Sequence, residues 1–273
     1  MNYSHAFHAG NFADIVKHAT LLAVLARLQA RGAPLSVVDT HGGRGLYDLA
    51  APEAKRSAEA ERGVLRLMAE PEAPGPILTL RQAILELNPS GHARFYPGSP
   101  RLVADRLGAK DRLTVFELNP REAEKLRSHL DGRPAVVVRQ EDGFQGATDL
   151  AVPGGHFLVL IDPPFERADD YARSAEALRR IRTACPGAVV IVWLPLKDLE
   201  TFDAFLREVE GPEGLLVAEA RIRPLRDPLH MNGCALVMSH APDGLAADVE
   251  AICRWTVEVL GHGGEARVWS LSC

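Results

Sequence analysis

Residues 156–165 read HFLVLIDPPF, and this stretch decides the fold class of the chain. Its run 157–161 is continuously apolar, as expected of a parallel strand that is covered on both faces. Asp162 then stands at the carboxyl end of that strand, the edge at which open α/β sheets bind ligands. The two prolines that follow fix φ and lack a backbone N–H, so they end the strand in a rigid turn.

The same turn suits an amino group attached to a flat base. Asp162 can accept one N–H bond of such a group, and a carbonyl freed by Pro163 and Pro164 can accept the other, while Phe165 stacks on the ring. We therefore expect these four residues to form a catalytic corner. The alternative interpretation is structural: Asp162 caps the next helix and the prolines only end the strand.

Around this strand, strand-like and helical stretches alternate, which predicts a parallel, doubly wound α/β sheet. The strands of this part are expected at 34–39, 112–118, 134–139, 157–161 and 188–194. An amphipathic helix is expected at 11–30, before the first strand, and further helices at 120–130 and 171–185 lie between later strands. Such a sheet brings the carboxyl ends of its strands to one edge.

Residues 46–94 interrupt the alternation after the first strand. They contain helical stretches near 53–69 and 77–87, separated by a cluster of prolines. We expect a helical insertion there. The sequence thus predicts a single Rossmann-like domain over residues 1–273, with an insertion subdomain at 46–94.

The last part of the chain has three strand-like runs, 215–224, 234–240 and 266–271, and one clear helix, 245–260. Short loops cannot make parallel crossovers, so at least one of these C-terminal strands is expected to be antiparallel.

Composition narrows the class of protein. The four cysteines, Cys185, Cys234, Cys253 and Cys273, have no CxxC or other metal-binding spacing, which predicts reduced thiols and no metal site. The N-terminus lacks the basic and apolar regions of a signal peptide, and the apolar runs are strand-sized, so we expect a soluble, cytoplasmic protein without a membrane segment. A net charge of −5 argues against indiscriminate binding of nucleic acid. Nothing in the sequence indicates an obligate protein partner.

Acidic residues stand at or just after the ends of four of the predicted parallel strands: Asp39, Glu117, Asp142 and Asp162. Glu117 is placed to accept bonds from ribose hydroxyls, and the Asp142-Gly143 pair could take an adenine edge. For Glu117 the alternative is a helix-capping role.

The turn at residues 42–45 reads GGRG, and its glycines, Gly43 among them, let the backbone pass close to a ligand. The turn lacks the GxGxxG spacing of a dinucleotide site, and the chain has no GxxxxGK[ST] motif. A nicotinamide-dependent oxidoreductase is therefore disfavoured.

A basic surface is expected on two segments. Eleven basic and nine acidic residues lie from Arg44 to Arg112, a net of +2. Arg221, Arg223 and Arg226 lie near the loop LRDPLHMNG, which could add to an RNA-contacting surface, although a solvated face is the simpler interpretation of any one arginine.

In order along the chain, the strings YSHAFHAGNFADIVKH, DTHGGRG, YPGSP, FELNP, EDGF and IDPPF resemble the motifs of the bacterial large-subunit ribosomal RNA methyltransferase J family. The resemblance covers nearly the whole chain. It implies a Rossmann-like methyltransferase fold and methylation of the N6 amino group of one adenine in 23S ribosomal RNA. It also implies S-adenosyl-L-methionine as the methyl donor, with no metal. DPPF alone is shared by many amino methyltransferases.

Carried onto this sequence, the resemblance implies a set of donor-binding residues: His18, His41, Ser99, Glu117, Asp142, Gly143 and Asp162, to which the glycine turn adds Gly43. It places Tyr3 against the RNA, with His5 and Lys17 on the substrate side. Two positions depart from the family pattern: Phe165 stands where Tyr is common, and Arg44 where a small residue is usual.

Other functions stay open from the sequence. The corner also fits an N6-adenine DNA methyltransferase or a protein glutamine N-methyltransferase. A non-catalytic RNA-binding module that kept the fold is the alternative from a different class.

Overall fold

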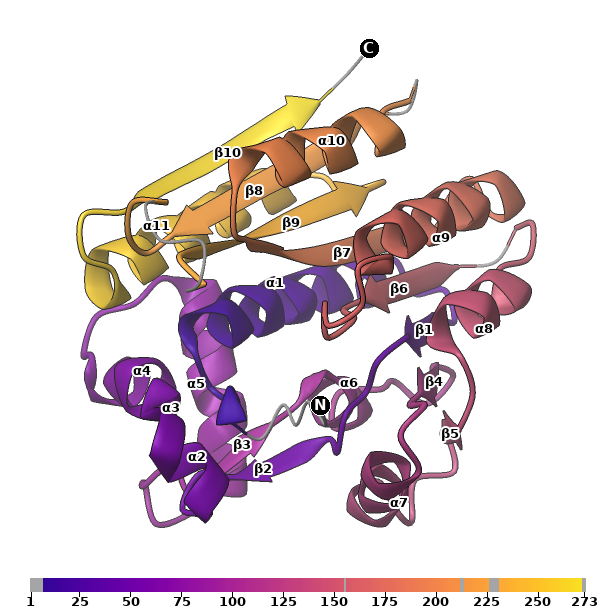
Figure 1. Cartoon of the computed structure of the whole chain (residues 1–273). Helices are drawn as coiled ribbons and strands as arrows, with labels where there is room; N and C mark the ends of the chain where they lie inside the picture. The colour runs from indigo at the N-terminus through magenta and orange to yellow at the C-terminus, as the bar shows by residue number, and fades with distance from the viewer. Residues whose placement is uncertain (1–6, 155, 212–213, 226–230, 272–273) are drawn as a thin grey trace.

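An eight-stranded sheet forms the centre of the molecule, with its strands in the order β10-β8-β9-β7-β6-β1-β4-β5 (Figure 1). The structure is a computed structural model that describes residues 7–154, 156–211, 214–225 and 231–271. The strands are β1 Ser36–Asp39, β4 Arg112–Phe116, β5 Val136–Arg139, β6 Phe157–Ile161, β7 Val189–Leu196, β8 Leu215–Arg221, β9 Gly233–Ser239 and β10 Glu265–Leu271.

Five neighbouring strands of the sheet, β7, β6, β1, β4 and β5, are parallel. Beyond them, β9 is antiparallel to both β7 and β8, and β10 is antiparallel to β8. The predicted fold class, a mostly parallel α/β sheet with an antiparallel C-terminal strand, is confirmed. Since β8 and β7 are both antiparallel to β9, β8 ends at the same edge of the sheet as the parallel strands.

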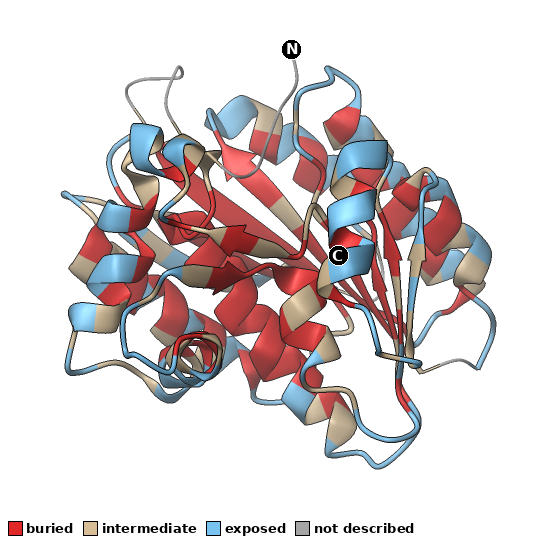
Figure 2. Cartoon of the chain, turned by 90° about the horizontal axis from the view of Figure 1, so that it is seen from below, coloured by how far each residue is buried: buried red, intermediate tan, exposed pale blue. Residues whose placement is uncertain are grey.

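Helices cover both faces of the sheet. One face carries α1 Phe12–Gln29, α6 Ser99–Ala104, α7 Pro120–His129 and α11 Leu245–Leu260, and the other carries α8 Gly143–Leu150, α9 Asp170–Ala184 and α10 Leu199–Val209. Helix α5 Gly75–Leu87 packs on α1 and α11. The sheet therefore has a hydrophobic core on each face. Successive strand residues point to opposite faces, so that Val37 packs in one core and Val38 in the other. The buried strands lie between the helix layers in Figure 2.

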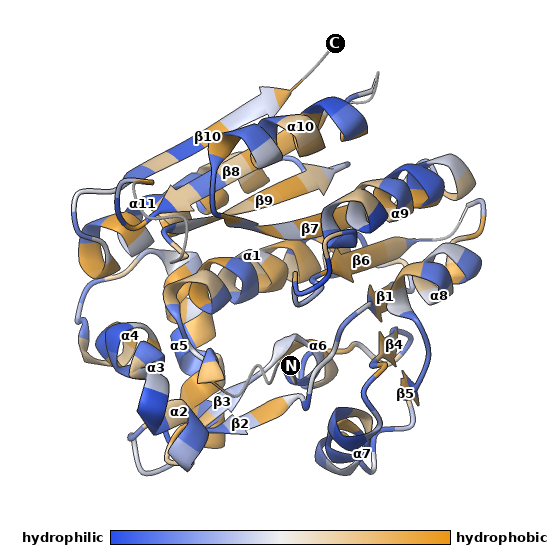
Figure 3. Cartoon of the chain, viewed as in Figure 1, coloured by the Kyte–Doolittle hydropathy of each residue, from blue (hydrophilic) through white to orange (hydrophobic). Residues whose placement is uncertain are grey.

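Strand β6 is buried at all five of its residues, as its apolar run predicts. Figure 3 shows β6 and β9 hydrophobic along most of their length, whereas α7, at the margin, is largely hydrophilic. Among the described residues, no helix is both long and apolar enough to cross a membrane.

The segment between β1 and β4 differs in detail from the expected helices. It contains β2 Leu46–Asp48, α2 Pro52–Ser57, α3 Glu59–Arg62, α4 Val64–Ala69, then α5, and β3 Phe95–Pro97. The helical stretch expected at 53–69 is divided into three, because Ala58 adopts a left-handed conformation (φ 53°) and Gly63 leaves the helical region. Strands β2 and β3 pair antiparallel, so this segment is not purely helical.

Candidate active site

The strand order reverses between β1 and β6. On one side of this point the sheet continues from β1 to β4 and β5, and on the other side it continues from β6 to β7. Ligands of open α/β sheets bind outside the carboxyl ends of the strands at such a point. Asp39 is the last residue of β1, and Asp162 directly follows β6. The reversal thus places two of the predicted strand-end acids at the expected ligand crevice.

Asp162 is paired with Lys17 of α1. The Lys17 Nζ lies 2.6 Å from Asp162 Oδ2 and 2.9 Å from Asp14 Oδ1. The side chains of Lys17 and Asp14 are 5% and 2% exposed, whereas that of Asp162 is 14% exposed. Asp162 is therefore the member of this cluster that a ligand can reach.

The first turn of α1 explains how Lys17 is held. Asn11 caps the helix by accepting the backbone N–H of Asp14, and Asp14 and Lys17 are neighbours on one helix face at i, i+3. Burial lowers the pKa of Lys17, but the carboxylates of Asp14 and Asp162 outweigh burial and raise it above its ordinary value. Lys17 is therefore a fixed cation, able to donate hydrogen bonds and not to accept a proton.

Aromatic rings surround the corner after Asp162. The Phe165 backbone has a left-handed φ of 52°, an unusual conformation for an aromatic residue, and such strain is often found at functional sites. Its ring centroid lies 4.7 Å from that of Tyr171 and 5.7 Å from that of Trp193. Trp193 follows Val192, the partner of Ile161 in the sheet, and Lys17 Nζ lies 5.7 Å from its ring centroid.

On the β1 side, Asp39 accepts a hydrogen bond from Ser99 Oγ at 2.6 Å. Burial raises the pKa of Asp39 to about 6; the hydrogen bond from Ser99 opposes the rise and the negative charge of Asp162 adds to it. His41 lies two residues later, and burial lowers the pKa of its imidazole to about 3. His41 is therefore neutral at physiological pH.

The glycine turn is attached to the end of β4. Gly43 donates its backbone N–H to Glu117 Oε2 at 2.9 Å, and Asn119 donates to Glu117 Oε1 at 2.8 Å. Gly43 has a φ of 58°, and a Cβ there would lie 2.4 Å from the Tyr47 hydroxyl, so only glycine fits without rearrangement. Burial raises the pKa of Glu117, and these two N–H donors oppose the rise. Asn119 itself, rather than Glu117, caps α7.

Arg44 points away from the turn to α7. Its Nε and Nη2 lie 2.7 Å and 2.9 Å from the two carboxylate oxygens of Glu122, and its guanidinium carbon lies 5.8 Å from the Tyr47 ring centroid. The departure from the family pattern at residue 44 thus forms a bidentate ion pair that links the turn to α7.

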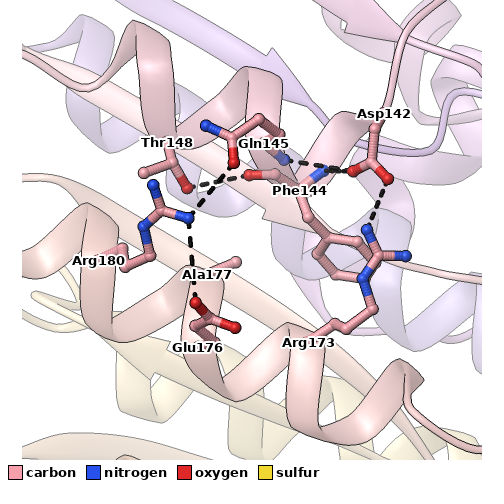
Figure 4. A pocket seen from close by; sticks show the side chains of 8 residues that line it. All are labelled: Asp142, Phe144, Gln145, Thr148, Arg173, Glu176, Ala177 and Arg180. Carbon is pink, nitrogen blue, oxygen red and sulfur yellow. Dashed lines mark hydrogen bonds and ion pairs between the residues drawn. The ribbon is translucent and has the colours of Figure 1, made fainter.

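Asp142 and Gly143 start α8. Asp142 Oδ1 accepts the N–H groups of Phe144 and Gln145, and its Oδ2 lies 2.5 Å from Arg173 Nη2 (Figure 4). Burial raises the pKa of Asp142, but Arg173 and the N–H donors of α8 outweigh burial and lower it below the ordinary value. Gly143 packs closely on Thr40, the residue after β1: a Cβ there would lie 1.8 Å from the Thr40 carbonyl oxygen.

A polar cavity of about 370 Å³ opens between α8 and α9 beside Asp142. The Arg173 guanidinium lies over the Phe144 ring at 4.4 Å, and the His41 ring meets the same ring edge-on at 4.8 Å. Phe144 thus separates this outer cavity from the turn that contains His41. The cavity is lined by Asp142, Phe144, Gln145, Thr148, Arg173, Glu176, Ala177 and Arg180.

The remaining predicted residues have different surroundings. His18 is buried, and its Nδ1 lies 2.8 Å from the hydroxyl of Tyr96. Tyr3 and His5 lie outside the described residues.

Arg221, expected on the RNA surface, is only 13% exposed and is paired with Glu219 and with Glu265, so that expectation is wrong for this residue. Its side chain is held by Glu219 of the same strand, β8, and by Glu265 of the neighbouring strand β10. Arg223 is exposed, and Arg226 lies outside the described residues.

The sequence reasoning missed Asp14, Trp193 and Arg173. Asp14 could have been found, because it stands three residues before Lys17 on the same helix face. Trp193 lies near the end of a predicted strand that neighbours the DPPF strand. Arg173 carries no local signal, because its contact with Asp142 depends on how α9 packs beside α8. Among the described residues, no group of three His, Cys, Asp or Glu side chains could hold a metal ion.

The chain is similar to known proteins over nearly its whole length. The family described as "Ribosomal RNA large subunit methyltransferase D, RlmJ" matches residues 32–271. The chain is 30% identical to the ribosomal RNA large subunit methyltransferase J of Haemophilus influenzae, over 95% of this chain and 94% of that protein. The Escherichia coli protein of the same name is 29% identical, over 93% and 92%.

A crystal structure of a Legionella pneumophila protein superimposes with a TM-score of 0.88 at 27% identity, covering 97% of this chain and 99% of that one. Sequence and fold therefore agree over nearly the whole length. The chain belongs to the ribosomal RNA large subunit methyltransferase family RlmJ.

Proposed function

We propose that this protein transfers the methyl group of S-adenosyl-L-methionine to the N6 amino group of one adenine in 23S ribosomal RNA, by direct in-line displacement. The observation that carries the proposal is the Asp162 carboxylate, fixed by Lys17 at the carboxyl end of β6, where the strand order reverses. Membership of the family supports ribosomal RNA as the acceptor over DNA or a protein glutamine.

The strand-end residues fit such a donor. A Cβ at Gly43 would clash with Tyr47 and one at Gly143 with the Thr40 carbonyl, so glycine is needed for the turn and the start of α8 to pack beside the proposed donor site. Each oxygen of Glu117 accepts one N–H and keeps a lone pair for a ribose hydroxyl. His41 is neutral and so does not repel a cationic sulfonium. We assign donor binding to His18, His41, Gly43, Ser99, Glu117, Asp142, Gly143 and Asp162; when bound, the donor supplies an electrophilic methyl carbon.

The corner after β6 would bind the acceptor base. Lys17 holds Asp162 Oδ2, so Oδ1 can accept an N–H from an adenine amino group. The amino nitrogen becomes more positive as it gains a methyl group, and the fixed Asp162 carboxylate stabilises that charge. Asp162 then takes the released proton directly or passes it to water. Pro163 and Pro164 keep the turn rigid, and Phe165 provides a ring on which the base can stack.

The rest of the RNA would meet the same edge of the sheet. A base within a duplex cannot reach Asp162, so the target is single-stranded or flipped out. We propose that residues 46–94 form an insertion subdomain that contacts RNA through exposed basic residues such as Lys55, Arg56, Arg62 and Arg66. Tyr3 and His5 complete the substrate side in this proposal, and the reaction takes place in the cytoplasm.

The acceptor is tested by tritium transfer from S-adenosyl-L-methionine. The acceptors are ribosomal RNA from cells that lack the gene, ribosomal RNA from wild-type cells, DNA and protein. We expect label only in the first, and mapping should place it on N6 of one adenine. Label in DNA or protein would replace the proposed acceptor, and no label in any of them would favour a non-catalytic RNA-binding module.

The role of Asp162 is tested with Asp162→Asn, which keeps the shape of the side chain and removes its charge. We expect the rate to fall by about 100-fold or more, because the charge next to the amino nitrogen is lost. Calorimetry should still detect donor binding. Glu166→Gln, four residues later on the exposed surface, is the matched control and should keep full activity. Near-normal turnover by Asp162→Asn would refute the assignment.

A further inference from the structure

The N-terminal turn that holds Lys17 is itself attached to the segment between β1 and β4. Asn11 Nδ2 donates to Glu59 Oε2 of α3 at 3.0 Å, and His8 Nδ1 lies 2.9 Å from Glu59 Oε1. A backbone hydrogen bond connects the same two segments: Val64 donates its N–H to the Gly10 carbonyl oxygen at 2.8 Å. Residues far apart in the sequence thus form one junction at the start of α1.

From this junction a continuous series of contacts leads to the corner after β6. Asn11 Oδ1 accepts the N–H of Asp14 at 2.9 Å, and Asp14 Oδ2 accepts the N–H of Gly10 at 2.9 Å. The other Asp14 oxygen pairs with Lys17, and Lys17 pairs with Asp162. Both oxygens of Asp14 are therefore occupied, so the direction of its carboxylate depends on where the turn at residues 10–11 is held.

Burial makes this series stiff. Asn11, Asp14 and Lys17 are 6%, 2% and 4% exposed, so water cannot easily replace a lost contact. The side chain of Glu59 is 25% exposed and stands where the series meets the surface of the insertion. Exposed basic residues of the same segment, Arg62 and Arg66, lie within seven residues of it.

We infer that Glu59 is a positioning residue for methyl transfer: through Asn11 and Asp14 it holds the Lys17 ammonium against Asp162. Glu59 is about 100 positions from Asp162 in the sequence and does not touch it. The segment that we assign to RNA contact is thereby joined to the acceptor side of the site. The inference rests on the proposed function for its kinetic test and needs a second test that does not depend on turnover.

The kinetic test compares Glu59→Ala with Glu59→Gln. Glutamine can still accept the Asn11 amide and offer a hydrogen bond to His8, so it should restore the position of the turn. We expect kcat of Glu59→Ala to fall by about tenfold, the effect of one lost buried hydrogen bond to a charged group, and kcat of Glu59→Gln to stay within about twofold of wild type. Donor affinity should be unchanged in both. Glu61→Ala, an exposed glutamate of the same helix, is the matched control.

A second variant separates the series from the helix cap. Asn11→Ser keeps a good N-cap for α1, but its side chain is too short to reach Glu59. It should lower kcat as much as Glu59→Ala does, and the double variant should be no slower than either single one, because all three lose the same contact. Additive losses, or an unchanged kcat in Glu59→Ala, would overturn the inference. A fall in donor affinity and melting temperature that matches the fall in kcat would reduce Glu59 to a structural role.

The test without turnover is nuclear magnetic resonance of the lysine ammonium groups. The chain has five lysines, and the signal that disappears in Lys17→Arg identifies Lys17. We expect that signal to shift and to exchange faster with water in Glu59→Ala, and to be unchanged in Glu61→Ala. An unchanged Lys17 signal in Glu59→Ala would overturn the inference about Glu59, whether or not the wild-type protein methylates ribosomal RNA. If the wild-type protein transfers no label to ribosomal RNA, the proposed function is wrong, but a shifted Lys17 signal in Glu59→Ala would still show that Glu59 positions Lys17.

Discussion

At the residue scale, Asp39 and His41 titrate far from their ordinary ranges for the same physical reason. Asp39 is buried and His41 partly buried at the end of β1, and loss of hydration disfavours the charged form of each group. The pKa of the Asp39 carboxyl rises to about 6, and that of the His41 imidazole falls to about 3. Asp39 therefore loses its proton close to physiological pH, and His41 stays neutral over the whole working range.

These two pKa shifts make the free energy of unfolding depend on pH in opposite directions. The native state keeps the Asp39 proton between about pH 4 and 6 while the unfolded chain has lost it, so the contribution of Asp39 is present at low pH and lost as pH rises to 6. The neutral His41 contributes stability above pH 6.5 that is lost as pH falls towards 3. The two contributions partly cancel in the wild-type protein.

The variant Asp39→Asn removes the pH-dependent contribution of Asp39 and leaves that of His41. Its amide can still pair with Ser99 and accept the His41 N–H, but it no longer ionises. Relative to wild type, the variant should gain about 2.5 kcal/mol in free energy of unfolding between pH 4 and pH 7, from the pKa rise of 3.8 to about 6. Urea denaturation at a series of pH values measures this difference. Asp131→Asn, the same substitution at an exposed aspartate, is the matched control.

At the scale of elements, the start of α4 packs directly on the turn before α1. A Cβ at Gly63 would lie 2.1 Å from the Gly10 carbonyl oxygen and 2.9 Å from the Asn11 Cα, and both of these are backbone atoms that cannot move independently. We expect Gly63→Ala to lower the free energy of unfolding by about 1 to 3 kcal/mol, because it forces α4 and α1 apart. Thermal unfolding followed by circular dichroism measures the loss.

Gly75→Ala is the control for this contact. Gly75 starts α5 in the same segment, and a Cβ there would meet nothing within 4 Å. Its substitution should be neutral or slightly stabilising, since alanine restricts the unfolded chain. Equal destabilisation by the two variants would show that the cost comes from the loss of glycine itself and not from the packing of α4 on α1.

At the scale of the whole molecule, the carboxyl ends of β6, β7 and β8 lie at one edge of the sheet, so residues distant in sequence share a surface there. Lys197 follows β7 and Arg223 follows β8, and both are exposed. This edge takes the place of the surface first expected from Arg221, whose guanidinium is held by Glu219 and Glu265.

The double variant Lys197→Ala/Arg223→Ala tests this edge. It should weaken RNA binding and reduce the slope of log affinity against log salt concentration by about 1 to 2, as two phosphate contacts are lost. Filter binding at several salt concentrations measures the slope. Lys110→Ala removes an exposed charge just before β4, at the opposite edge, and should leave the slope unchanged. An unchanged slope in the double variant would exclude these two residues from the RNA contact surface.

Local patterns predicted much of the secondary structure. The expected strand 157–161 and helix 245–260 have the observed bounds, because a continuous apolar run and a helical period are short-range signals. The helix expected at 53–69 is broken at Ala58, whose left-handed conformation is not signalled by its residue type, because alanine favours helices. The helices α8 and α10 were not specified, although a capping aspartate precedes each of them.

By itself, the sequence determined which residue types stand at the strand ends and, through its motifs, the family. Only the tertiary structure decided which of these residues meet: Lys17 and Asp162 are 145 positions apart, and Asp142 is paired with an arginine of another helix. The physical reason is the range of the forces. Caps, periodicity and turn geometry act between neighbours along the chain, whereas the pairing of buried charges depends on how α1, the insertion and α9 pack against the same sheet.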